Sequence, residues 1–536
     1  MSAGTAPGAV LLNLAQDLAV PNVRSGKVHS NIHNLTSSAD GAGARPVALA
    51  AQLPPVLLLN AAIWALAAWL SRGNLDVSGD MVQDYAWGIE WQASYAHHPP
   101  LFAWVSAAWF SVMPRVDLSF YVLSMVNAAV GLLGVAALAR RFLTPDRAAL
   151  AALALAVSPL YSSLAIKFNA NAILLSLWPW AATFFVAFMQ EGRRRDAIAC
   201  GALVGLSFLG KYFSVVMMCA LLLVALAQPA WRRRLFSLNA ALGLAVGVAV
   251  LVPHVMWVFD HQFSTLRFAQ KRSDGTLLQS VPQLVRYVLA QVAYLLPSLA
   301  VLLWIVPGGR RRNAIMLAGR ALFGPGTQPE LWWLTMAPLL VVATIAVIHG
   351  TSMASVWGMA QWFAVTALWL SVWDRHGIDP RMDRLRQVLP LYWALVLAIA
   401  IAVGYGEARG GSEGASLPRA ELARVALAQW HERTGRPLVW VAGPFAEAMS
   451  VTFYAPGTTR WWSLGAPEKS PWMSAADLRR DGSLLVCAEN DLDCQREAAK
   501  LVAEPPVHVS VRKHAWGLEL PLYAYRLFFV LPSTDP

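Results

Sequence analysis

Charged residues are scarce in this chain of 536 residues: Asp, Glu, Lys and Arg supply 14%, whereas hydrophobic residues supply 57%, and the mean hydropathy is +0.48. Soluble proteins carry roughly a quarter charged residues, so this composition excludes an ordinary soluble protein and indicates a membrane protein. The net charge of +11 resembles a nucleic-acid-binding signal. The arginines, however, occur in short clusters between apolar runs, which is the pattern that sets membrane topology.

Apolar runs long enough to cross a bilayer recur along the chain. They predict an all-α polytopic membrane protein with about eleven transmembrane helices. The predicted spans are residues 54–70, 118–138, 148–165, 172–189, 197–209, 212–227, 235–259, 284–306, 331–348, 356–372 and 388–403. The run at residues 101–113 is short for a span, and we expect it to lie along the membrane interface.

The basic clusters test this assignment, because cytoplasmic loops carry an excess of Lys and Arg. All clusters fall on the cytoplasmic side if the N-terminus is inside and Gly210-Lys211 is an outer turn between two short helices. The clusters are residues 140–141, 193–195, 232–234, 310–312 and 375–386. The same arrangement collects the polar patches on the periplasmic face of a bacterial inner membrane. These patches are the loop around Asp80, residues 167–171, Lys211, residues 260–279 and residues 349–357.

Hydropathy divides the chain into residues 1–52, 53–406 and 407–536. The first segment is polar and lacks a good secretory signal, so we expect a largely disordered cytoplasmic tail. The last alternates helix and strand patterns, which predicts a small soluble α/β domain on the periplasmic side. Its predicted helices are residues 422–431, 446–453 and 493–502, and its predicted strands are 437–442, 483–488 and 523–530. Cys487 and Cys494 lie at a strand end and a helix start, where a disulfide fits an oxidising compartment.

A polar, aromatic stretch at residues 79–101 directly follows the first apolar run. Asp80 and Asp84 are four residues apart, so a helix would place both carboxylates on one face. Two nearby carboxylates repel, which raises the pKa of one and suits it to accept a proton. A solvated helix that begins with an acidic residue explains the same spacing. The sequence His97-His98-Pro-Pro would end this helix, because proline restricts its predecessor and has no N–H.

The motif Tyr95-Ala-His-His98-Pro-Pro-Leu, preceded by an acidic helix with aromatic residues, resembles the first extracytoplasmic loop of the GT-C superfamily of polyprenyl-phosphate-sugar-dependent glycosyltransferases. More narrowly, it resembles the bacterial PMT_2-type and Rgt-like branch, akin to protein O-mannosyltransferases and the aminoarabinose transferase of lipid A. The resemblance implies that Asp80 is the catalytic base and that Tyr95 and His98 belong to the substrate site. The Glu that usually follows this Asp is Met81 here. Asp84 is therefore the alternative base or the second carboxylate.

Further motifs extend the likeness over about residues 54–400. Residues 168–175 resemble the family's second loop, with Asn171 where the family has Asp, and residues 205–212 resemble its Gly-Leu-x-x-Leu-x-Lys-Tyr turn. Residues 253–272 resemble its Pro-x-x-x-Trp segment with the Phe-Gln and Arg that follow. The candidate substrate-binding residues in these motifs are Asn171, Lys211, Arg267, Lys271 and Arg272. A cation there would stabilise the departing lipid phosphate. Snorkelling of Lys211 and attraction of the other basic residues to lipid headgroups are the alternative explanations.

These features favour an inverting glycosyltransferase that moves a sugar from a polyprenyl-phosphate donor to a lipid, glycan or protein hydroxyl. No nucleic-acid partner is expected. No metal site is predicted, because the histidines lack metal-ligand spacing, and the need for a divalent cation stays open, as do the sugar, the acceptor and the oligomeric state. A transporter or flippase of polyprenyl-linked substrates competes, but the sequence has no internal repeat. A catalytically inactive scaffold is the third reading, suggested by Met81 and Asn171.

Overall fold

The computed structural model describes residues 48–261, 263, 265, 277–326, 328–349 and 354–533. All that follows concerns the described residues within Val47–Pro536. Nearly all of the expected N-terminal tail lies outside the described residues. Three candidate site residues also lie outside them: Arg267, Lys271 and Arg272.

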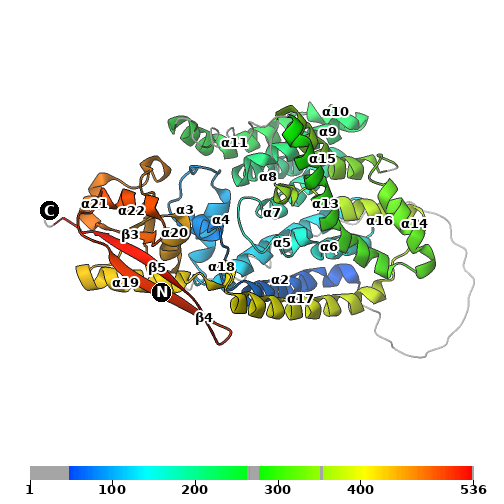
Figure 1. Ribbon diagram of the computed structural model, residues 1–536. Helices are drawn as coiled ribbons and strands as arrows, with labels where there is room; N and C mark the ends of the chain where they lie inside the picture. The colour runs from blue at the N-terminus through cyan, green and yellow to red at the C-terminus, as the bar shows by residue number, and fades with distance from the viewer. Residues whose placement is uncertain are drawn as a thin grey trace, which may run out of the picture. The chain divides into compact units, whose positions relative to one another are not determined.

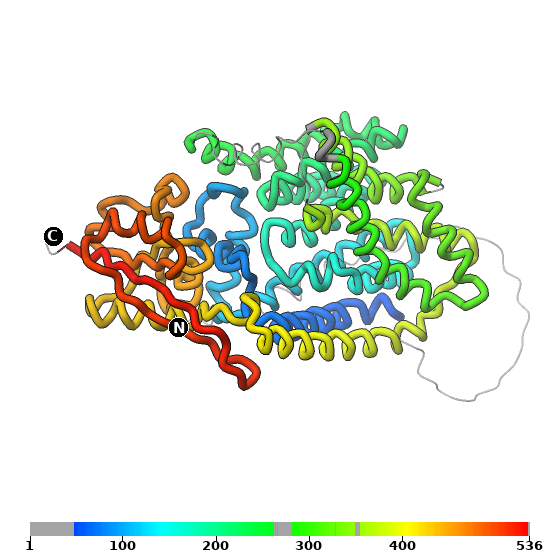
Figure 2. Tube along the Cα trace, viewed as in Figure 1, coloured from blue at the N-terminus to red at the C-terminus, as the bar shows by residue number. Residues whose placement is uncertain are grey.

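The membrane part is helical, and the predicted fold class is confirmed. Its α-helices are α2 (Leu49–Arg72), α3 (Asp80–Gly88), α4 (Leu101–Phe110), α5 (Asp117–Ala139), α6 (Pro145–Ala156), α7 (Leu174–Glu191), α8 (Arg194–Gly210), α9 (Val215–Ala227), α10 (Pro229–Leu235), α11 (Leu238–Asp260), α13 (Leu277–Ile305), α14 (Arg311–Arg320), α15 (Pro329–His349), α16 (Val365–Arg375) and α17 (Met382–Gly410). Figure 2 follows the same course in colour from blue to red.

Within the described residues, six helices are long and apolar enough to cross a membrane, namely α2, α5, α11, α13, α15 and α17. Three of the predicted spans contain only short α-helices, of 12 residues in α6, 13 residues in α9 and 11 residues in α16. Short 3-10 turns accompany them, Pro159–Tyr161 after α6 and Ser355–Gly358 before α16. The count of about eleven spans therefore stays a prediction.

Several helices pack through small residues. The helices α2 and α17 lie side by side (Figure 1), and the carbonyl oxygen of Leu70 lies against the Cα of Gly404. On α8, Gly201 faces Gly243 of α11, and a Cβ on Gly201 would overlap the Gly243 carbonyl oxygen. Such close backbone approach is the usual way in which membrane helices pack, because lipid leaves only van der Waals contact and hydrogen bonding to hold them together.

The C-terminal α/β domain is confirmed, with a five-stranded sheet of order β2-β1-β3-β5-β4. Strand β1 pairs in parallel with β2 and β3, whereas β5 is antiparallel to both β3 and β4. The strands are β1 (Trp440–Ala442), β2 (Arg460–Trp462), β3 (Ser483–Ala488), β4 (Val507–Ala515) and β5 (Leu518–Val530). The helices are α18 (Glu413–Ser416), α19 (Arg419–Thr434), α20 (Phe445–Tyr454), α21 (Ala475–Asp481) and α22 (Leu492–Ala499).

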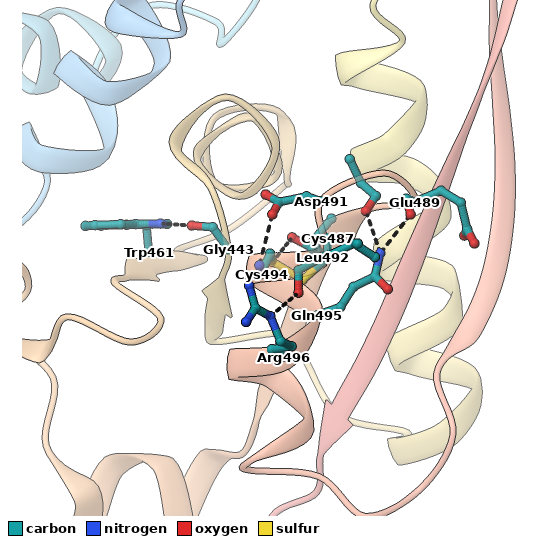
Figure 3. Close-up of a disulfide and its surroundings, with 11 residues drawn as sticks. Gly443, Trp461, Cys487, Glu489, Asp491, Leu492, Cys494, Gln495 and Arg496 are labelled. Atoms are coloured by element: carbon teal, nitrogen blue, oxygen red, sulfur yellow. Dashed lines mark hydrogen bonds between the residues drawn. A yellow bond between two sulfur atoms is a disulfide. The ribbon is translucent and has the colours of Figure 1, made fainter.

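A disulfide joins Cys487, near the end of β3, to Cys494 on α22, as the sequence predicts (Figure 3). Asp491 caps α22 by accepting the backbone N–H of Cys494 at 2.9 Å, so the second cysteine is held at the start of the helix. The amide of Gln495 donates to the carbonyl oxygens of Ala488, at 3.0 Å, and Glu489, at 2.9 Å. The strand end and the helix are therefore held together by both a covalent bond and hydrogen bonds.

Candidate functional site

Helix α3 begins at Asp80, and the carboxylate that caps it is Asp76. The two oxygens of Asp76 accept the backbone N–H of Asp80 at 3.0 Å and of Met81 at 3.1 Å, and the hydroxyl of Ser78 lies 2.6 Å away. Gly79 has a φ of 77°, a conformation that favours glycine, and a Cβ there would press against Ala446 of α20 at 3.0 Å. The turn from Asp76 to Asp80 is thereby fixed before the helix starts.

Lys167 joins the two acidic residues at this turn. Its Nζ lies 3.1 Å from the carboxylate of Asp76 and 2.7 Å from that of Asp80, and it also donates to the Ser78 hydroxyl at 2.7 Å. Burial raises the pKa of Asp76, but the charge of Lys167, the hydrogen bonds from Ser78 and the backbone of Met81, and the charge of Arg419 together outweigh it and hold this pKa below its usual range. Burial lowers the pKa of Lys167, yet the two carboxylates raise it above its usual value. Both groups are therefore charged at neutral pH.

The two predicted carboxylates differ in environment. The side chain of Asp80 is 41% exposed, whereas Asp84, one turn along α3, is 1% exposed. Burial raises the pKa of Asp84 well above its usual range, and the negative charges of Asp80 and Asp76 raise it further. Within the part of the chain that the structure describes, Oδ2 of Asp84 has no hydrogen-bond partner. The helix thus presents one accessible carboxylate and one buried carboxyl group.

The structure brings the candidates Asn171 and Lys211 together. The ammonium of Lys211 donates to the side-chain oxygen of Asn171, and it lies 4.6 Å from the ring centroid of Trp357. Asn169 caps the turn that follows it, because its side-chain oxygen accepts the backbone N–H groups of Asn171 and Ala172 at 2.9 and 3.1 Å. The segment 167–171 therefore contacts the acidic turn through its first residue and Lys211 through its last.

Tyr95 and His98 shape the loop that ends at the His-Pro-Pro turn. The Tyr95 ring is buried, stacked on Trp87 at 5.0 Å between centroids and edge-on to Trp472 at 6.3 Å. The carbonyl oxygen of His98 accepts the backbone N–H of Tyr95 at 3.1 Å. The imidazole ring of His98 lies edge-on to the ring of Phe102, with 5.8 Å between centroids. These contacts assign both residues to the architecture of the loop, and their predicted contact with substrate stays a prediction.

The middle of the same loop is held by α11. Nδ1 of His254 lies 2.9 Å from the carbonyl oxygen of Ala93, which can only accept, so Nδ1 carries the proton and Nε2 accepts the hydroxyl of Tyr212 at 2.9 Å. Trp257 donates to the side chain of Gln92 at 3.4 Å. His254 is thus occupied by protein partners. Among the residues that the structure describes, no three His, Cys, Asp or Glu side chains are placed to hold a metal ion.

The C-terminal domain completes the surroundings of α3. Arg419 donates to the carbonyl oxygen of Val77 at 3.0 Å, and Arg460 forms an ion pair with the buried Glu90. Asp76, Lys167, Glu90 and Arg460 are functional candidates that the sequence pattern did not single out. Lys167 lay in a predicted polar patch, and the spacing Asp76-x-Ser-Gly-Asp was the signal for a capped turn.

Three comparisons with known proteins show what the chain is similar to. The family model described as dolichyl-phosphate-mannose-protein mannosyltransferase (PMT_2) matches residues 97–257. Lipid A galacturonosyltransferase RgtD of Rhizobium johnstonii is 23% identical over 326 residues, 59% of this chain and 64% of that protein. Lipopolysaccharide core galacturonosyltransferase RgtA of the same organism is 23% identical over 360 residues, 65% of this chain and 70% of that protein.

Among solved structures, ArnT from Cupriavidus metallidurans, bound to undecaprenyl phosphate, matches with a TM-score of 0.57 at 16% identity. The match covers 89% of this chain and 97% of ArnT. The apo form of the same protein gives a TM-score of 0.55. The predicted resemblance to the GT-C glycosyltransferases is thereby confirmed, and the fold agrees over most of the chain.

Proposed function

Because the chain has the fold of the GT-C glycosyltransferases and resembles them in sequence, we propose that it is an integral inner-membrane glycosyltransferase. It transfers a sugar, with inversion, from a polyprenyl-phosphate-linked donor to a hydroxyl group of a lipid, glycan or protein on the periplasmic face. The observation that carries this proposal is the Asp80 carboxylate, which is 41% exposed at the start of α3 and lies 2.7 Å from Lys167.

Asp80 is the general base in this proposal. A base must come within hydrogen-bond reach of the acceptor hydroxyl, which an exposed carboxylate on a capped helix start can do. Asp84 is fully buried, so its carboxyl group is out of reach of an acceptor hydroxyl, and burial raises its pKa well above the usual range, which favours the protonated form that cannot accept a proton. The buried position of Asp84, one turn after Asp80 on α3, supports a structural role.

Lys211 binds the lipid phosphate. The departing polyprenyl phosphate gains negative charge as the glycosidic bond breaks, and a fixed cation stabilises that charge. The contacts of Lys211 with Asn171 and Trp357 orient its ammonium group. The segment 167–171 connects this cation to the base through Lys167, which supports a single site that holds the acceptor at one end and the phosphate at the other.

The comparisons suggest which substrates to test first. RgtD and RgtA are galacturonosyltransferases of lipid A and of the lipopolysaccharide core, and ArnT was solved with undecaprenyl phosphate. We therefore infer a sugar linked to undecaprenyl phosphate as donor, with galacturonate as the first candidate sugar. Lipid A and the lipopolysaccharide core are the first candidate acceptors.

The experiment is a transfer assay with the full chain reconstituted in lipid vesicles. A panel of radiolabelled undecaprenyl-phosphate sugars is offered with lipid A and lipopolysaccharide core as acceptors, and native protein is compared with Asp80→Asn and Asp493→Asn. Asp493 is an exposed residue of α22, so its variant controls for handling and folding. Transfer by the native protein and by Asp493→Asn, but not by Asp80→Asn, is the expected result.

Absence of transfer from every donor by a folded native protein would contradict the proposal. In that case, uptake of the same donors into sealed vesicles without a covalent product would identify a transporter.

A further inference from the structure

The tip of the β4–β5 hairpin carries a tryptophan in an unfavourable backbone conformation. Ala515 pairs with Leu518, so the turn consists of Trp516 and Gly517 alone. Their φ angles are 56° and 73°. A two-residue turn with positive φ at both positions prefers Asn-Gly, and a bulky residue at the first position is unfavourable there. The turn itself therefore does not explain why Trp516 is there.

The tip lies against a membrane-spanning helix. Cζ2 of Trp516 is 3.2 Å from the place that a Cβ on Gly404 of α17 would occupy. The red hairpin in Figure 1 reaches from the sheet to the C-terminal end of α17. Gly404 directly follows the apolar run at residues 388–403, and the first charged residue beyond it is Glu407. The tip therefore lies at the level where the apolar part of the span ends.

Two further aromatic side chains occur at the same level. The carbonyl oxygen of Leu70 on α2 also touches Gly404. Trp69 precedes Leu70 in the sequence and Tyr405 follows Gly404. All three aromatic residues are partly exposed: Trp69 by 50%, Tyr405 by 45% and Trp516 by 41%. Tryptophan and tyrosine concentrate at the boundary between lipid headgroups and acyl chains, because one end of the side chain is apolar and the other forms hydrogen bonds.

We propose that the β4–β5 hairpin is a membrane anchor, in which Trp516, together with Trp69 and Tyr405, inserts at the headgroup–acyl boundary of the phospholipid leaflet beside the C-terminal domain. The partner is the phospholipid of the membrane that α17 spans. The exposed surface of α17 just before Gly404 is apolar, with Ile401 47% and Val403 43% exposed, as contact with acyl chains requires.

The anchor has a consequence for the site. Lys513, three residues before Trp516, donates to the carbonyl oxygen of Gly73, and its Nζ lies 3.5 Å from the side-chain oxygen of Asn74. Residues 73–74 lead directly into the turn that Asp76 caps. A hairpin held at the bilayer surface therefore fixes the height of this turn above the membrane, and with it the height of the groups that meet a lipid-linked substrate.

The test measures the depth of the tip in a bilayer. Cys200 and Cys219 are replaced by serine, the Cys487–Cys494 disulfide is retained, and a nitroxide label is attached at Trp516→Cys or, as a control, at His508→Cys. His508 is exposed and lies roughly 26 Å up the same strand at about 3.3 Å per residue. The full chain is reconstituted in phosphatidylethanolamine–phosphatidylglycerol vesicles. Collisions of each label with oxygen, which enters lipid, and with a water-soluble nickel complex are then compared.

We expect the label at 516 to favour oxygen and the label at 508 to favour the nickel complex. Equal access of nickel to both labels would overturn the proposal. Broadening of the spectrum by a second label would overturn it too, because another copy of the chain would then cover the tip. A label at Leu518→Cys, with Trp516 retained, gives the same measurement if Trp516→Cys does not fold, and its preference for oxygen or nickel decides in the same way.

Discussion

Arg460, on the edge strand β2 of the C-terminal sheet, forms an ion pair with Glu90. Glu90 lies in the loop that follows α3, and its side chain is 1% exposed. Nε of Arg460 lies 3.0 Å from Oε1 of Glu90, and the guanidinium carbon lies 4.4 Å from the ring centroid of Trp440. The C-terminal domain therefore contacts both sides of α3: Arg460 binds Glu90 after the helix, and Arg419 binds the carbonyl oxygen of Val77 before it. Through these two contacts the C-terminal domain fixes the positions of the residues that precede and follow Asp80.

Replacing Arg460 by glutamine should destabilise the protein by on the order of 3 kcal/mol, because it leaves a buried carboxylate without its cation. Burial raises the pKa of Glu90, and Arg460 opposes this rise. Without Arg460 the folded-state pKa rises further above the unfolded one, so stability is lost as pH rises through that folded pKa. The deficit should therefore be larger at about pH 8 than at about pH 5. Thermal unfolding in detergent measures it.

Arg496→Gln is the matched control for this variant. Arg496 pairs with Asp493 on the surface of α22, with both side chains more than 70% exposed, at 75% and 85%. Such a pair contributes less than about 1 kcal/mol. Equal effects of the two substitutions would show that Glu90 does not depend on Arg460.

Asp84→Asn should leave transfer activity within about tenfold of native, whereas Asp80→Asn should lower it by about 100-fold to 10,000-fold. The asparagine replaces a buried carboxyl group whose pKa burial raises, which favours the uncharged form that asparagine resembles. Because the folded-state pKa of Asp84 is raised, the native protein loses stability as pH rises from the ordinary Asp range towards that pKa. The variant lacks this loss, so its unfolding temperature relative to native should increase with pH. Loss of activity in Asp84→Asn at full stability would instead identify Asp84 as the base.

Asp76→Asn should lower both stability and activity, although Asp76 is not the base. The substitution removes the charge that caps α3 and pairs with Lys167, for a loss of about 1–3 kcal/mol. The folded-state pKa of Asp76 lies below its unfolded value, so its contribution is present above the ordinary Asp range and disappears as pH falls through the folded pKa. Native and variant should therefore converge in acid.

Activity separates a positioning role for Asp76 from a purely structural one. If Asp76 positions Asp80, kcat falls while KM for the donor changes little, and Asp76→Glu recovers part of the rate. A stable variant with native kcat would contradict this role.

Local patterns predicted the elements whose residues carry strong signals of their own. Strand β3 spans the predicted residues 483–488, and α20 and α22 lie within two or three residues of their predicted bounds. The sequence prediction missed two strands, β2 and β4. The three residues Arg460–Trp462 become β2 only because they pair with β1. Strand β4 does carry a local signal, because Val507, Val509 and Val511 alternate with polar residues, and its long pairing with β5 stabilises it.

The site was predictable only in part, for a related reason. Asp80, Asn171 and Lys211 belong to short motifs that can be recognised in the sequence alone. Which residues contact them depends on distant parts of the chain: Lys167 reaches Ser78 across 89 positions, and Arg460 reaches Glu90 across 370. The capping role of Asp76 has a local signal in the spacing Asp76-x-Ser-Gly-Asp. The roles of Lys167 and Arg460 follow from long-range contacts, and no local spacing encodes them.

Lys211→Met should lower kcat/KM for the polyprenyl-phosphate donor by about 100-fold to 1,000-fold, because it removes the cation that stabilises the departing phosphate. The methionine keeps the apolar length of the side chain, so packing against Trp357 is largely preserved.

Free undecaprenyl phosphate should inhibit the native protein more strongly than Lys211→Met, and Lys211→Arg should restore part of both effects. Lys500→Met is the control and should behave as native, because Lys500 is an exposed residue that directly follows α22. If Lys211 only snorkels towards the membrane surface, Lys211→Met will keep native kcat/KM and native inhibition, as Lys500→Met does. A snorkelling side chain contacts headgroups and not the donor.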